Sequence, residues 1–324
     1  MSCHLKVYSG PYNESSTCTI AYPCNSITTA LNYSQSNYTI CIEPGEYDPV
    51  GDVQNITNST NISLIGYPTY NQSVDISCDK VKTKEYAFNI SNSAITLIEN
   101  LIIKDCNSSQ ITSTNIQIKN TTFMNNMGNF GGALEINGDS DVMIIDSHFK
   151  TNIANSHGGA ISVQFSHFSL INSEFHNNSA VGFHPDLDGN FGGRGGALYA
   201  FQNSENMGNS KGGTNSPNSI QNCSFTQNSA TLEGGAISLN LMIVKTTIED
   251  SDFYENFISS NYDCLSDSCQ IRGGAIHALY SPISLDLCNF EHNYISTIEN
   301  DQVYDYIYIF FNCFYSILIS YLKK

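Results

Sequence analysis

Apolar and polar residues alternate in short runs along most of the chain. In Leu134–Ile136, Ile161–Val163 and Ile237–Leu239, two apolar residues flank a polar one. A period of two is typical of strands, whose side chains point alternately to the two faces of a sheet. The runs are separated by Gly, Asn and Ser, which favour turns. The pattern therefore predicts many short strands and few helices.

Two tetrads recur in strict alternation through most of the chain. One has the pattern Gly-Gly-Ala-(Leu/Ile) and begins at Gly131, Gly158, Gly195, Gly234 and Gly273. The other has the pattern Phe-x-x-Asn and occurs as Phe123/Asn126, Phe149/Asn152, Phe175/Asn178, Phe225/Asn228, Phe253/Asn256 and Phe290/Asn293. Where no insertion intervenes, the pattern returns after about 26 residues, which predicts the coils of a stacked solenoid.

A single coil of this size cannot bury its apolar side, so stacked coils must share a core. We expect the six Phe rings to stack on one another inside the solenoid. The Gly pairs supply positive φ at corners that leave no room for Cβ. The repeated Asn residues are expected to adopt the left-handed backbone conformation and to form a hydrogen-bonded ladder between coils. Near the start, Asn25 or Ser26 is expected to cap a short helix that covers the first coil.

The alternating tetrads resemble those of chlamydial polymorphic outer membrane proteins and of related eukaryotic β-helix proteins. Pro23–Leu31 and Ile42–Tyr47 are similar to the entry coil of pectin-lyase-like chains. The resemblance implies an all-β fold, a single-stranded right-handed parallel β-helix with a short N-terminal capping helix. We place this β-helix at residues 20–295, after an N-terminal segment of residues 1–19 and before a hydrophobic C-terminal tail of residues 296–324.

The chain is acidic, with 13 basic and 30 acidic residues and a net charge of -17. Its 40% hydrophobic content is sufficient for a buried core. Because so negative a surface repels phosphate backbones, we exclude nucleic acid as a partner.

Eleven Cys residues and twelve Asn-x-Ser/Thr sequons favour an extracellular or cell-surface glycoprotein, although no signal peptide is visible at the start. Cys264 and Cys269 are a candidate local disulfide. Three further cysteines are predicted to be packing groups in the small-residue position two before each Phe, namely Cys106, Cys223 and Cys288. The pairing among five others stays open: Cys3, Cys18, Cys24, Cys41 and Cys78.

No set of catalytic residues is evident in the sequence. Arg194 and Arg272 each precede a Gly pair, but other coils carry Phe, His or Glu there, which favours a variable surface position. Asp146 and Asp250 share a position with Asn residues of other coils, which favours a turn role. We therefore predict no catalytic residue and no cofactor.

One inserted loop contains a candidate calcium site. Asp186, Asp188 and Asn190 offer oxygen ligands at alternate positions, the ligand type that calcium prefers. The distal bidentate Glu of a complete calcium loop is missing.

The hydrophobic tail contains an uncharged stretch, residues 306–322, followed by Lys323 and Lys324. Its length is at the lower limit for a membrane span. Three interpretations stay open: a membrane span, a truncated or misread end of the chain, and a terminal cap of the solenoid.

The sequence thus predicts a non-catalytic extracellular or cell-surface scaffold for adhesion, which contacts surface proteins or glycans through its inserted loops and long solenoid face. The alternative is a pectin-lyase-like polysaccharide lyase or glycoside hydrolase, which the fold resemblance implies. A groove with clustered acids, Arg or His would favour the enzyme, and scattered polar residues would favour the scaffold.

Overall fold

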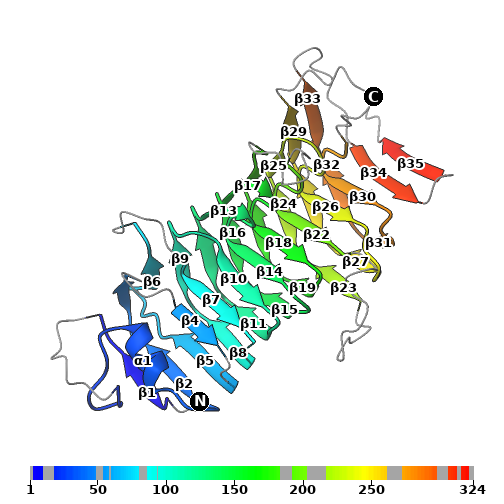
Figure 1. Cartoon of the computed structure of the whole chain (residues 1–324). Helices are drawn as coiled ribbons and strands as arrows, with labels where there is room; N and C mark the ends of the chain where they lie inside the picture. Colours follow the sequence, from blue (N-terminus) through cyan, green and yellow to red (C-terminus); the bar gives the residue numbers. More distant parts are fainter. Residues whose placement is uncertain are drawn as a thin grey trace.

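The computed structural model describes residues 3–9, 18–48, 54–57, 60–79, 86–92, 94–182, 192–202, 217–260, 272–297, 306–311 and 315–320. Over these residues the chain forms the predicted parallel β-helix, with one short helix. Successive coils follow one another along the axis from the N-terminal to the C-terminal end (Figure 1). Four sheets run along the stack, and we number them in the order in which a coil visits them.

Sheet 1 contains, in spatial order, β1 (Leu5–Val7), β2 (Thr39–Ile42), β5 (Thr60–Gly66), β8 (Ala94–Glu99), β11 (Asn115–Lys119), β15 (Asp141–Ile145), β19 (His167–Ile171), β23 (Asn218–Gln221), β27 (Thr246–Glu249) and β31 (Ile283–Asp286). Sheet 2 contains β3 (Gly45–Tyr47), β6 (Val74–Ser77), β9 (Ile102–Lys104), β12 (Thr122–Met124), β16 (His148–Lys150), β20 (Glu174–His176), β24 (Ser224–Thr226), β28 (Asp252–Tyr254) and β32 (Asn289–Glu291).

Sheet 3 contains β13 (Met127–Phe130), β17 (Ile153–His157), β21 (Ser179–Ala180), β25 (Ser229–Ala230), β29 (Phe257–Ser260) and β33 (Tyr294–Thr297). Sheet 4 contains β4 (Gln54–Thr57), β7 (Phe88–Ser91), β10 (Ser109–Thr112), β14 (Leu134–Asn137), β18 (Ile161–Gln164), β22 (Leu198–Phe201), β26 (Ile237–Asn240), β30 (Ile276–Leu279), β34 (Tyr306–Phe311) and β35 (Tyr315–Ser320).

The six repeated Phe residues form one interior stack, as predicted. They pair in register along sheet 2 from β12 to β32. Consecutive ring centroids lie 4.7 to 4.9 Å apart, with interplanar angles of 3° to 7°. Each ring that is fully buried contributes about 1.5–3 kcal/mol through removal of apolar surface from water. The stack therefore specifies both the core and the register of the coils.

The paired Gly residues form the corner before sheet 4, and their predicted role is confirmed. Gly234 has φ +62°, in the left-handed region. A Cβ at Gly235 would lie 2.0 Å from the carbonyl oxygen of Gly274 in the next coil. Backbone approaches backbone so closely here that no side chain fits.

The predicted Asn ladder is confirmed by the side-chain hydrogen bonds between coils. Asn256 shows the pattern: its Nδ2 donates to Asn293 Oδ1 at 2.9 Å and to the carbonyl oxygen of Phe225 at 2.8 Å. Its own Oδ1 accepts from Asn228 Nδ2 at 2.9 Å and from the backbone N–H of Asn228 at 3.0 Å. All of these bonds are buried, so the ladder links the coils inside the molecule.

The backbone conformation that we assigned to the ladder residues is wrong. None of them has positive φ: Asn126, Asn152, Asn178, Asn228, Asn256 and Asn293. Positive φ belongs instead to the residue before each one: Asn125, Thr151, Asn177, Gln227, Glu255 and His292. For Asn256, the left-handed residue is thus Glu255, with φ 52°. The preceding residue makes the turn from sheet 2 to sheet 3, which leaves the ladder amide free to point into the interior.

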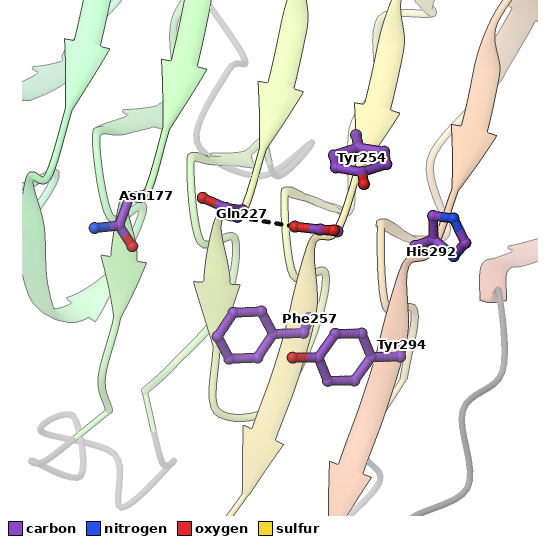
Figure 2. A pocket seen from close by; sticks show the side chains of 7 residues that line it. Asn177, Gln227, Tyr254, Phe257, His292 and Tyr294 are labelled. Carbon is purple, nitrogen blue, oxygen red and sulfur yellow. Dashed lines mark hydrogen bonds between the residues drawn. The ribbon is translucent and has the colours of Figure 1, made fainter.

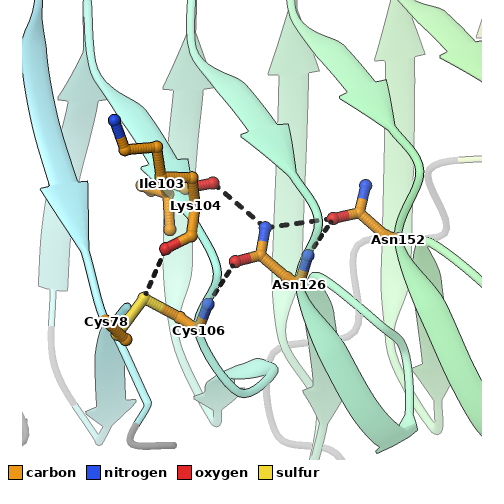
Figure 3. The surroundings of a disulfide bond; sticks show 6 residues. All are labelled: Cys78, Ile103, Lys104, Cys106, Asn126 and Asn152. Atoms are coloured by element: carbon orange, nitrogen blue, oxygen red, sulfur yellow. Dashed lines mark hydrogen bonds between the residues drawn. A yellow bond between two sulfur atoms is a disulfide. The ribbon is translucent and has the colours of Figure 1, made fainter. Parts of the chain in front are cut away.

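The coil before Phe123 corrects the prediction for Cys106. Ile103 pairs with Phe123, so Ile103 stands at the Phe position and Cys106 at the Asn position. Figure 3 shows the result: Cys106 forms a disulfide with Cys78, and its backbone N–H donates to Asn126 Oδ1 at 3.0 Å. Cys106 is therefore a covalent link at the start of the ladder and not a packing group in the small-residue position.

The N-terminal cap is confirmed. In α1 (Ile27–Tyr33), Ser26 is the N-cap and its Oγ accepts from the backbone N–H of Thr29 at 3.1 Å. The buried face of α1 carries Ile27 and Ala30 and packs against β1, β2 and β4. Strand β1 lies within residues 1–19, so the first sheet begins in the segment that we predicted to precede the β-helix. Two disulfides join this region, Cys3–Cys41 and Cys18–Cys24.

Strands β34 and β35 belong to the hydrophobic tail. β34 extends sheet 4 in parallel with β30, and β35 pairs antiparallel with β34. Among the described residues, no helix has the length and apolar character needed to cross a membrane. The membrane span stays a prediction.

Candidate functional site

An aromatic hollow lies on the outer surface where sheets 2 and 3 meet, in the C-terminal half of the β-helix. Its volume is about 550 Å³. It is lined by Asn177, Gln227, Tyr254, Glu255, Phe257, His292 and Tyr294 (Figure 2). We call this set the aromatic hollow.

The ladder determines which side chains reach the hollow. Four lining residues stand at the positive-φ turn position directly before a ladder Asn: Asn177, Gln227, Glu255 and His292. Phe257 and Tyr294 directly follow the ladder residues Asn256 and Asn293, and in sheet 3 they align with Ser179 and Ser229 of the preceding coils. Because serine is small, the side of the Phe257 ring toward β25 stays uncovered by its neighbours in this row. The hollow thus results from large aromatic residues that follow small ones.

Aromatic rings form two contacts in the hollow. Phe257 and Tyr294 are parallel, with 5.2 Å between ring centroids and an interplanar angle of 7°. Tyr254 and His292 meet edge to face, with 5.7 Å between centroids. Figure 2 shows the first pair on neighbouring strands, with Tyr254 and His292 above it in the view. Tyr254 is 39% exposed, and Phe257 and Tyr294 are partly exposed, so a partner can reach these rings.

Glu255 supplies the negative charge of the hollow. Gln227 Nε2 donates to Glu255 Oε2 at 2.8 Å. Hydrogen bonds from Gln227 and then Tyr254, together with the nearby His292, lower the pKa of the Glu255 carboxyl. The hydrogen bond between Tyr254 and Glu255, together with the negative charge of Glu255, raises the pKa of the Tyr254 phenol. At neutral pH the hollow therefore contains a carboxylate beside a protonated phenol.

A second group of polar side chains, which we call the corner cluster, lies at the Gly corners. It consists of Arg194, Tyr199, Glu233, Arg272 and His277. Arg194, Glu233 and Arg272 each precede a Gly pair, and they align in register in successive coils. Tyr199 and His277 stand in β22 and β30 of sheet 4, with β26 between them, five residues after Arg194 and Arg272.

Glu233 is the centre of the corner cluster. Its Oε2 lies 3.0 Å from Arg194 Nε and 3.3 Å from His277 Nδ1. The Arg194 and Glu233 side chains are 22% and 13% exposed, and His277 is 0% exposed. We predicted a variable surface position for the arginines, and the structure instead places Arg194 in a largely buried ion pair.

Burial determines the protonation state of His277. Desolvation lowers the pKa of His277 to about 4; Glu233 opposes this effect, and Arg272 and Arg194 reinforce it. The imidazole is therefore neutral at neutral pH. Burial also raises the pKa of Tyr199. Because His277 has no exposed surface, a substrate cannot reach its ring in this arrangement, which favours a structural role for the cluster.

The predicted turn role of Asp146 and Asp250 is confirmed, with φ of 49° and 48°. Neither one joins the aromatic hollow or the corner cluster. Cys223 is a buried packing group, as predicted, and Cys288 is partly buried. The calcium candidates Asp186, Asp188 and Asn190 and the disulfide candidates Cys264 and Cys269 lie outside the described residues. Within the described residues, no group of three or more His, Cys, Asp or Glu side chains could hold a metal ion.

Sequence reasoning placed Arg194, Glu233 and Arg272 in one column but missed their contact with His277, and it missed the aromatic hollow. His277 contacts Glu233 of the preceding coil, and the contact becomes visible only when the register is known. A change in the sequence indicates the hollow: the residue after the ladder Asn is Ser179 and Ser229 in the earlier coils and Phe257 and Tyr294 in the later ones.

Comparison with known protein families supports the repeat. The model of the Chlamydia polymorphic membrane protein (Chlamydia_PMP) repeat matches residues 222–240, which contain one Phe-x-x-Asn and one Gly-Gly-Ala-Ile tetrad. The predicted resemblance to these repeats is confirmed. No curated protein sequence matches the chain.

Solved structures that are similar to the chain include a pectin methylesterase and a rhamnogalacturonan lyase. A pectin methylesterase from Aspergillus niger has 13% identity and a TM-score of 0.47, and the alignment covers 92% of this chain and 86% of that one. A rhamnogalacturonan lyase has 15% identity and a TM-score of 0.41, with 91% and 67% covered.

Proposed function

We propose that the protein is a non-catalytic extracellular or cell-surface scaffold that binds a surface protein or a glycan through the aromatic hollow. The observation that carries this proposal is the hollow itself, which accessible aromatic rings and a carboxylate line together. Accessible aromatic side chains are typical of binding surfaces, because they supply large contact area at little cost in conformational entropy. The rigid coils beneath the hollow hold these side chains in place.

The remaining features agree with a surface location. The matched repeat is named for a membrane protein of Chlamydia. Three disulfides join cysteines of the described residues, and disulfides persist mainly in oxidising compartments. The net charge of -17 keeps such a scaffold soluble and disfavours polyanionic partners.

Binding of the full chain to intact cells and to immobilised matrix proteins and glycans tests the proposal. Phe257→Ala and Tyr294→Ala are expected to reduce binding at least tenfold. Tyr70→Ala provides the control, because Tyr70 is fully exposed and lies outside the hollow. Equal binding by the hollow variants and the control would contradict the proposal.

The alternative function, a polysaccharide lyase, would have to rest on the corner cluster. Glycoside hydrolysis by the usual route needs two carboxyl groups, and the cluster supplies one, Glu233. Elimination chemistry needs a single base beside cationic groups, which Glu233 and the two arginines provide. Release of unsaturated products from a panel of acidic glycans, abolished in Glu233→Gln, would establish this function. We expect no turnover, because His277 is fully buried and Glu233 is paired.

A further inference from the structure

The aromatic hollow has the chemistry of a cation site. Phe257, Tyr294 and Tyr254 line it, and Glu255 lies among them with its position held by Gln227. The face of an aromatic ring carries negative partial charge and attracts a cation that lies within about 6 Å of the ring centre. A carboxylate between such rings adds a full negative charge. The rings and the carboxylate therefore both favour a cationic ligand.

The sequence around the hollow strengthens this preference. Segments 246–260 and 282–297, which form the two coils that carry the aromatic rings, contain no Lys or Arg, and His292 is their one basic residue. Their acidic residues are Glu249, Asp250, Asp252, Glu255, Asp286 and Glu291. Carboxylates at this density create a negative potential that attracts cationic partners and repels anionic ones.

The dimensions and lining of the hollow distinguish between cations. A hard metal ion requires several oxygen ligands at about 2–2.6 Å, and the described residues contain no group of three or more His, Cys, Asp or Glu side chains that could hold one. A hollow of about 550 Å³ accommodates an organic group. A neutral sugar would stack on the rings but would gain little from the surrounding carboxylates.

We propose that the aromatic hollow binds the ammonium group of a lysine side chain on a partner protein. The inference deepens the proposed function, on which it rests, by naming the partner chemistry of the same surface. Phe257 and Tyr294 contact the methylene stem and the ammonium group, and Glu255 pairs with the charge. Asp252 and Glu291 guide lysine-rich segments toward the hollow.

Titration of the full, disulfide-bonded chain with the peptide Gly-Lys-Gly-Lys-Gly-Lys, blocked at both ends, tests the inference by calorimetry. A matched peptide with acetylated lysines removes the charge and retains the stem. Phe257→Leu and Tyr294→Leu remove the π face but retain apolar volume, so each is expected to weaken binding by about 2-fold to 30-fold. Glu255→Gln is expected to weaken it by at least fivefold. Glu249→Gln is the control, because this exposed acid lies in the same coil but outside the hollow.

Three outcomes would overturn the inference. Equal affinity for the acetylated peptide would show that the charge is not recognised. Equal effects of Glu249→Gln and Glu255→Gln would show diffuse attraction without a site. Binding of an N-acetylglucosamine oligomer, lost in Phe257→Leu, with no binding of the lysine peptide, would assign the hollow to a neutral glycan. In that last case the proposed scaffold function stands, and it is tested separately by the cell-binding experiment.

Discussion

Replacement of one ladder Asn should destabilise the β-helix far more than replacement of an Asn that forms the same type of bond at the surface. In Asn178→Ala, the lost side chain donates to Phe149 O and to Asn228 Oδ1, and it accepts from the backbone N–H and the Nδ2 of Asn152. All of these groups are buried between coils. The substitution therefore removes four hydrogen bonds from a place that water cannot enter.

The magnitude follows from these four bonds. The backbone N–H of Asn152 loses the acceptor that the ladder provides, and an unsatisfied buried donor costs about 1–3 kcal/mol. The other three bonds contribute about 1 kcal/mol each, since their groups retain other partners or relax. We expect a loss of about 4–6 kcal/mol in the free energy of unfolding. Such a loss is a large fraction of the stability of an ordinary domain.

Asn155→Ala is the matched control. Asn155 Nδ2 also donates to an Asn of the previous coil, Asn129 Oδ1, at 3.1 Å, but this bond lies at the surface. We expect its loss to cost less than about 1 kcal/mol. Urea unfolding followed by far-ultraviolet circular dichroism measures both variants, and hydrogen exchange shows whether the opening is local to the coils around residue 178. Similar losses for Asn178→Ala and Asn155→Ala would refute the reasoning that buried amide pairing stabilises the coils.

Three further predictions concern His277 and the cysteines. Because the pKa of His277 is lowered from 6.5 to about 4 in the folded chain, the unfolded chain binds this proton first as the pH falls. Between pH 7.5 and pH 5 the free energy of unfolding of wild type should therefore fall by about 2 kcal/mol more than that of His277→Gln. Parallel profiles of unfolding free energy against pH would contradict the burial argument. The Cys78–Cys106 disulfide spans 28 residues, so the double variant Cys78→Ser/Cys106→Ser should have a free energy of unfolding lower by about 3–4 kcal/mol. An unchanged midpoint of urea unfolding would exclude a stabilising role of the disulfide. Burial raises the pKa of the Cys223 thiol to about 11. Site-resolved mass spectrometry should therefore find Cys223 unmodified by iodoacetamide at pH 8 in the folded chain and modified in urea. Rapid labelling without urea would show that the thiol is accessible.

The repeat made the centre of the fold predictable from sequence, and the limits of the prediction have physical causes. Phe123 and the five later Phe residues fixed the register, because stacked rings tolerate no shift. Before Phe123 the aromatic residue is replaced by Ile103, which removes that marker, so Cys106 was assigned to the wrong column. The repeat also hid a conformational detail: Asn256 and its equivalents recur because their amides pair, whereas several residue types make the turn before them, such as Glu255.

Contacts between coils were the second limit. Glu233 and His277 belong to neighbouring coils, and an inserted loop separates them along the chain, so spacing alone did not bring them together. The hollow depends on the change from Ser229 to Phe257 in one column, which is informative only after the column has been aligned. Residues that repeat in every coil were therefore predictable, and residues that differ between coils were not.

The Asn ladder has a consequence for how such proteins diversify. Each rung offers the same donor to one neighbour and the same acceptor to the other, from Asn126 to Asn293. Duplication or deletion of a whole coil within a gene would therefore leave every rejoined amide with a compatible partner. The molecule can change length in evolution by complete modules, while the solvent-facing side chains of each module are free to acquire new recognition properties.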